Sequence, residues 1–78
     1  MKDKIRNFII SNFMFDEGSL GDDDLLFETG IIDSMGFIKL LAFIDKTFNL
    51  SMDMSEISID NFNTLNNIVK SLERKINR

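Results

Sequence analysis

Hydrophobic side chains recur every three or four positions in three segments of this 78-residue chain, which is the spacing of amphipathic helices. Alternation with a period of two, the pattern of a half-buried strand, is hard to find, and proline is absent. The pattern predicts helices over residues 3–14 and 34–48, a last helix that begins near Asn63 or Thr64, and one short helical turn within residues 53–61. The side chains expected on the core faces are Ile5, Phe8, Ile9 and Phe13, then Phe37, Leu40, Leu41, Ile44 and Phe48, then Leu65, Ile68, Val69, Leu72 and Ile76. We therefore expect an all-α fold, a small bundle of three to four helices.

Polar residues and glycines mark the ends of these helices. Asp33 is the expected N-cap of helix 34–48, because its carboxylate can accept hydrogen bonds from the free N–H groups at the positive end of the helix dipole. Asn49 suits the C-terminal end of the same helix. Gly18 and Gly21 open a long loop between the first two helices, and such a loop in a small domain is often functional. The side chains expected to pin this loop to the core are Leu25, Leu26 and Phe27.

Helix 34–48 carries a second apolar stripe outside its core face. Met35, Ile38 and Ala42 form this stripe, and Lys39 and Lys46 lie close to it. A surface helix needs only one buried face, and a fully buried helix is hard to arrange in a chain of this length. We therefore interpret the stripe as a surface that a partner protein binds.

The composition describes one small domain and excludes several kinds of chemistry. The apolar fraction is 44%, with eight Phe and five Met, so well-patterned helices can bury a core. Cysteine and histidine are absent, which excludes a thiol nucleophile, an imidazole base and a zinc site built on sulfur or nitrogen ligands. No segment suits a signal peptide or a membrane span, and we expect a cytoplasmic protein.

Charge is unevenly distributed along the chain, although the net charge is only −4. Residues 16–60 hold eleven acidic and two basic residues, whereas both ends are basic. An acidic middle should attract basic partners and repel nucleic acid. The alternative is that the acidic loop is merely solvated and aids solubility.

The acidic residues suggest two kinds of site, a calcium site and a pair of catalytic carboxylates. An EF-hand counted from Asp22 needs glycine at its sixth position and glutamate at its twelfth, but these are Phe27 and Asp33. A glycosidase needs two carboxylates across a cleft, and nothing in the sequence indicates a cleft. Catalysis by this chain alone is not expected, and no metal site is expected.

Ser34 stands at the start of a helix, after a long loop and beside the apolar stripe. It cannot be the nucleophile of a catalytic triad, because the chain has no histidine and GIIDSMG is not a nucleophile elbow. Its position suits modification, since a phosphate ester there would meet free N–H groups and the positive end of the dipole. The simpler alternative is that Asp33 and Ser34 only cap the helix.

Together these residues resemble the carrier-protein family, which comprises acyl, peptidyl and D-alanyl carriers. The resemblance covers almost the whole chain and centres on residues 25–50, LLFETGIIDSMGFIKLLAFIDKTFNL. The family's attachment motif is Asp-Ser-Leu or its Asp-Ser-Met variant, and here it reads Asp33-Ser34-Met35. Residues 60–73, DNFNTLNNIVKSLE, also resemble the family's entry to its last helix. The resemblance implies an acyl-carrier-protein-like fold and a single carrier domain over residues 1–78.

The resemblance also implies a prosthetic group and a set of partners. Ser34 would be esterified with 4′-phosphopantetheine from coenzyme A by a phosphopantetheinyl transferase, so that the missing thiol is imported. An adenylating ligase or acyltransferase would load the cargo, and a downstream synthase or transferase would receive it. The chain would be a monomer that catalyses nothing itself. The partner-binding residues implied on the second helix are Met35, Ile38, Lys39, Ala42, Asp45 and Lys46.

The cargo stays open between fatty acyl, β-hydroxyacyl, aminoacyl and D-alanyl groups. GIIDSMGF is most similar to D-alanyl carriers and to stand-alone carriers that adenylating enzymes load. Carriers of fatty-acid synthesis are usually acidic on the second helix, whereas here Asp45 is the one acidic residue between Ser34 and Phe48. The large Phe37, Phe43 and Phe48 suggest a filled interior, which favours small cargo. Two other functions stay open from the sequence: a helical protein-interaction adaptor without a prosthetic group, and a calcium-binding regulatory domain.

Overall fold

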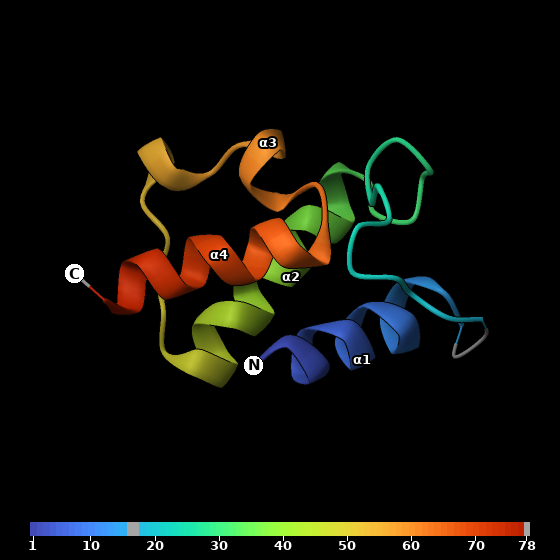
Figure 1. Ribbon diagram of the computed structural model, residues 1–78, viewed down its shortest axis with the longest axis horizontal. Coiled ribbons are helices and arrows are strands. Elements are labelled where there is room, and N and C mark those ends of the chain that lie inside the picture. Colours follow the sequence, from blue (N-terminus) through green and yellow to red (C-terminus); the bar gives the residue numbers. More distant parts are fainter. Residues whose placement is uncertain (16–17, 78) are drawn as a thin grey trace.

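Four α-helices and one 3-10 turn form the secondary structure of residues 1–15 and 18–77, which this computed structural model describes (Figure 1). The helices are α1 (Lys2–Phe13), α2 (Ser34–Phe48), α3 (Ile59–Phe62) and α4 (Leu65–Ile76), and η1 (Met54–Glu56) precedes α3. Helix α4 packs against both α1 and α3, and α1 packs against α2. The predicted all-α bundle is confirmed, but residues 53–62 form two short turns instead of one.

The hydrophobic core is built from the predicted faces of the helices. Its fully buried side chains are Ile5 and Ile9 of α1, Leu40 and Ile44 of α2, Phe62 of α3, and Leu65, Ile68 and Leu72 of α4, together with Leu20, Leu26 and Ile32 of the loop. The half-buried side chains packed around them include Phe8, Phe13, Phe37, Leu41, Phe48 and Val69. The long loop before α2 therefore contributes to the core as each helix does.

Two side chains expected in the core lie outside it. Ile76 is 51% exposed, because the last turn of α4 extends to the edge of the bundle (Figure 1). Leu25 is 39% exposed, whereas the next residue, Leu26, is fully buried. The backbone N–H of Leu26 donates to the carbonyl oxygen of Asn63 at 2.8 Å, which fixes the loop with Leu26 inward. Neighbouring side chains point in different directions, so Leu25 faces solvent.

The predicted helix caps are present. Asp33 Oδ1 accepts a hydrogen bond from the N–H of Gly36 at 2.7 Å, as an N-cap carboxylate does. Asn49 ends α2 in the left-handed conformation, with φ of 56°. Thr64 caps α4 by accepting from the N–H of Asn67 at 3.1 Å. These caps explain why the predicted limits of α2 and the predicted start of α4 are correct to within one or two residues.

Asp22 ties the acidic loop to the N-terminal turns of α1 and α4. Its carboxylate forms ion pairs with Arg6 and with Lys2, the latter at 3.2 Å between Nζ and Oδ2. Lys2 also donates to Asn66 Oδ1 at 2.8 Å, and the N–H of Asn66 donates to the carbonyl oxygen of Asp22. The hydrogen bond from Lys2, assisted by the charges of Lys2 and Arg6, lowers the pKa of Asp22 below its ordinary 3.8. Part of the acidic loop is thus ion-paired and not merely solvated.

Candidate functional site

Ser34 is the first residue of α2, and its side chain is exposed. Asp33 holds the first turn through two hydrogen bonds. Its carboxylate accepts from the N–H of Gly36, and its carbonyl oxygen accepts from the N–H of Phe37 at 2.8 Å. The fully buried Ile32 anchors the chain just before this cap. The Ser34 hydroxyl is therefore presented to solvent at a fixed point of the bundle.

The first turn of α2 has capacity to hold an anion. No described residue accepts a hydrogen bond from the N–H of Ser34 or of Met35, because the cap uses only the next two N–H groups. These N–H groups lie at the positive end of the helix dipole. A phosphoryl group on the Ser34 oxygen would meet them, so the residues present suit a phosphate ester.

The six residues predicted to bind partners share one face of α2. At about 100° per residue they span an arc of about 120° that adjoins Ser34 and avoids the core face. Met35 is 67% exposed and Ile38 is 64% exposed, so the apolar stripe is open to solvent. Lys39, Ala42, Asp45 and Lys46 are exposed as well, and Asp45 accepts a hydrogen bond from Ser51 Oγ at 3.1 Å. The structure thus brings the serine and this face together.

A comparison with protein-family models decides the class of the chain. The model described as "Phosphopantetheine attachment site" matches residues 3–72. The chain belongs to this family. It is a carrier protein, and its prosthetic group is 4′-phosphopantetheine. The alternative of an adaptor without a prosthetic group is not favoured by this match.

Curated proteins similar to this carrier are named D-alanyl carrier proteins. That of Streptococcus suis (strain 05ZYH33) is 35% identical over 72 residues, which cover 92% of this chain and 90% of the relative. That of Streptococcus pyogenes serotype M5 (strain Manfredo) is 38% identical over 61 residues, covering 78% of this chain and 76% of the relative. Carriers of this family act together with partner enzymes such as transferases and ligases.

A solved structure confirms the fold. The solution structure of a holo acyl carrier protein from Nitrosomonas europaea matches with a TM-score of 0.84 at 24% identity, over 99% of this chain and 96% of that one. The predicted acyl-carrier-protein-like bundle is therefore confirmed. Among the described residues, no helix has the length and apolar character that crossing a membrane would require.

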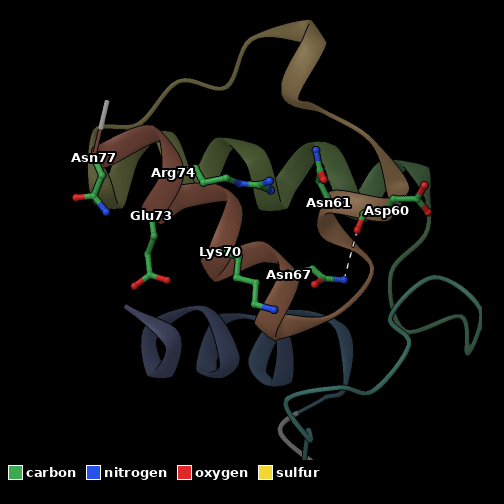
Figure 2. A pocket seen from close by; sticks show the side chains of 7 residues that line it. All are labelled: Asp60, Asn61, Asn67, Lys70, Glu73, Arg74 and Asn77. Atoms are coloured by element: carbon green, nitrogen blue, oxygen red, sulfur yellow. Dashed lines mark hydrogen bonds between the residues drawn. The ribbon is translucent and has the colours of Figure 1, made fainter.

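A separate polar groove of about 700 Å³ lies on α3 and α4 (Figure 2). Two basic side chains, Lys70 and Arg74, and two acidic ones, Asp60 and Glu73, line it, so that its charges balance. Asn67 Nδ2 donates across part of it to the carbonyl oxygen of Asp60 at 3.4 Å (Figure 2). None of its lining residues belongs to α2 or to the loop before it, so this groove is not part of the carrier site.

Sequence reasoning missed the residue that packs behind the site. Gly36 is buried two residues after Ser34, against the ring of Phe13 at the end of α1. The glycine was visible in the sequence next to the motif, but its neighbour in space was not, because Phe13 belongs to another helix. A second glycine near the motif, Gly30, has φ of 80° and gives the loop a left-handed turn.

Proposed function

We propose that Ser34 is the residue esterified with the 4′-phosphopantetheine group. The observation that carries this proposal is an exposed hydroxyl at the first residue of a capped helix, next to two N–H groups that no described residue accepts from. Asp33 acts as the helix cap and as the neighbour that the motif requires. When bound, the group supplies a thiol on a flexible arm, to which acyl cargo is attached as a thioester.

The chain's own role is to present Ser34 and to be recognised by partners in turn. A phosphopantetheinyl transferase that uses coenzyme A modifies it, an adenylating ligase or acyltransferase loads it, and a synthase or transferase unloads it. The exposed face that these enzymes contact comprises Met35, Ile38, Lys39, Ala42, Asp45 and Lys46. The protein is a non-catalytic, cytoplasmic monomer formed as one carrier domain over residues 1–78.

The cargo we propose is a small aminoacyl group of the D-alanyl type. The names of the similar curated proteins support this, since they are D-alanyl carrier proteins. The packing of the interior supports it as well. The ring of Phe37 contacts Phe62 at 5.4 Å and Phe27 at 5.3 Å between ring centroids, and these rings fill the space between α2, α3 and the loop.

Neither the groove on α3 and α4 nor the groove beside the partner face is lined by a side chain of the buried hydrophobic core. The groove beside the partner face, about 230 Å³, is lined by Leu41, Met52 and Ile57 together with Ala42, Asp45 and Ser51. A long acyl chain would have to displace Phe37 or Phe62 to enter the bundle. A small cargo stays outside, on the end of the arm.

The attachment site is tested by intact mass after incubation with coenzyme A and a promiscuous phosphopantetheinyl transferase. The wild type is expected to gain the mass of one phosphopantetheine group, and Ser34→Ala is expected to gain nothing. Ser11→Ala is the matched control, because Ser11 is also an exposed helical serine and its loss should leave the modification intact. Modification of the Ser34→Ala variant would refute the assignment.

The cargo is tested on the holo protein. The holo protein should accept D-alanine from an adenylating ligase, and loading is measured as a further increase in its mass. Chemical loading with an octanoyl group should leave the melting temperature within about one degree, because a chain that stays outside the core removes no apolar surface from water. A rise of several degrees would show that the bundle encloses long chains and would contradict the small-cargo proposal.

A further inference from the structure

Gly36 is packed so closely that a side chain there would fit only if its neighbours moved by a few tenths of an ångström. A Cβ atom added there would lie 3.0 Å from Phe13 Cε1, 3.3 Å from Asp33 Oδ1 and 3.3 Å from Ile32 Cγ2. These neighbours come from the end of α1, the N-cap and the anchored residue before the cap. Any residue larger than glycine must therefore move the aromatic ring of Phe13, the capping carboxylate of Asp33 or the side chain of Ile32.

The same residue supplies the N–H group that the cap uses. Gly36 donates to Asp33 Oδ1 at 2.7 Å, so the ring of Phe13 and the carboxylate of Asp33 both contact the backbone of this one turn. First turns of helices fray because their N–H groups lack partners within the helix. Here the cap and the ring together hold the turn.

Phe13 is itself held by an aromatic chain that returns to α2. Its ring meets Phe8 edge-on, with centroids 5.8 Å apart, and Phe8 stacks on Phe43 at 4.1 Å. Phe43 lies about two helical turns after Gly36 on the same helix. Helix α1 therefore contacts α2 at two places, the first turn of α2 and a point about two turns further along it. These two contacts fix the direction of the first turn of α2 relative to the bundle.

Ser34 lies on the other side of that turn. Two residues correspond to about 200° around the helix, so contact of Gly36 with α1 turns Ser34 toward solvent. We propose that Gly36 and Phe13 are positioning residues for the modification of Ser34: they clamp the first turn of α2 against α1, and so hold the hydroxyl at the angle that the transferase needs. This rests on the proposed function, in which Ser34 is the modified residue.

The test measures kcat and KM of the phosphopantetheinyl transferase for four carriers: wild type, Gly36→Ala, Phe13→Leu and the double variant. Gly36→Ala crowds Phe13 and the cap by a few tenths of an ångström. If the first turn of α2 shifts in response, kcat is expected to fall about tenfold, since misplacement by 1 Å can cost about a hundredfold. KM should stay within about twofold, because the exposed face of α2 is unchanged. Leucine is smaller than phenylalanine at the crowded Cε1 position, so the double variant should recover most of kcat.

A second buried substitution separates positioning from loss of stability. Ile68→Val removes one methyl group from the core on α4 and should lower the melting temperature without changing kcat. Phe13→Leu alone loosens the clamp without crowding it and should lower kcat about threefold, which keeps the proposal testable if Gly36→Ala does not fold.

Three results would overturn the proposal. They are an unchanged kcat in Gly36→Ala or in Phe13→Leu, a fall in kcat that Ile68→Val reproduces, and a double variant no faster than Gly36→Ala. Each would make the packing of Gly36 structural only, and modification of Ser34 would still stand. Modification of Ser34→Ala would instead refute the proposed function itself, so the two failures are distinguishable.

Discussion

Replacing Asp33 with alanine removes the side-chain cap of α2 and leaves the rest of the site unchanged. The capping hydrogen bond, 2.7 Å from the N–H of Gly36 to Asp33 Oδ1, is lost, and that N–H is left without a protein acceptor. Alanine in place of an aspartate N-cap costs about 1 kcal/mol, within a range of about 0.5–2 kcal/mol. In a domain of this size, 1 kcal/mol lowers the melting temperature by roughly 4–8 °C.

The assay is thermal and urea unfolding followed by far-ultraviolet circular dichroism. Asp33→Ala should lower the urea midpoint at an unchanged slope, because the surface exposed on unfolding is unchanged. Asp33→Asn is the matched control, since asparagine caps a helix about as well as aspartate and loses only the charge. The free energy of unfolding should fall less than half as far in Asp33→Asn as in Asp33→Ala.

Two outcomes would refute this reasoning. A melting temperature of Asp33→Ala within about one degree of the wild type would mean that the cap contributes nothing. Equal losses in the alanine and asparagine variants would mean that the charge of Asp33, and not its hydrogen bond, stabilises the helix. Hydrogen exchange at the Gly36 amide gives an independent reading, because only loss of the cap should accelerate it in the folded state.

Three further predictions concern the loop, the core and the partner face. Since the pKa of Asp22 is lowered in the folded state, its ion pairs stabilise the fold above pH 3.8, and this stability is lost as the pH falls through the folded-state pKa. Asp22→Asn should therefore make the stability measured by circular dichroism depend less on pH in the acid range. An unchanged pH dependence would contradict the ion pairing. Leu72→Ala should cost about 2–5 kcal/mol in urea titrations, whereas Ile76→Ala should stay within about 0.5 kcal/mol, and equal losses would contradict the assigned core. Ile38→Asp should raise the KM of the transferase at least about tenfold at an unchanged melting temperature, with Ile76→Asp as a control at another solvent-exposed isoleucine. An unchanged KM would exclude Ile38 from the partner face.

Much of the fold could be predicted from sequence because its determinants are local. Helix α2 begins after Asp33 and α4 begins after Thr64, and each of these side chains accepts a hydrogen bond from the N–H three residues later. Helix α2 ends at Asn49, which adopts the left-handed conformation. The exposure of Met35 and Ile38 could also be predicted, because a chain this small can hardly bury two faces of one helix.

The parts that failed depend on neighbours distant in the chain. Ile76 continues the apolar spacing of α4, but this spacing does not show where along α4 the other helices cease to cover it. Asp22 belongs to an acidic run, and only the folded chain places Lys2 and Arg6 beside it. The tight contact of Gly36 with Phe13 likewise joins two helices, so the sequence showed a glycine without the reason for it.

The claim that Ser34 carries the prosthetic group is tested most directly by locating the added mass. After modification the protein is digested with trypsin, and the fragment that spans residues 7–39 is sequenced by tandem mass spectrometry. This fragment holds three serines, Ser11, Ser19 and Ser34, so the measurement discriminates among them. The account predicts one phosphopantetheine group per chain, on Ser34 alone. A group found on Ser11, Ser19 or any other residue, or a chain that takes up none, would contradict it.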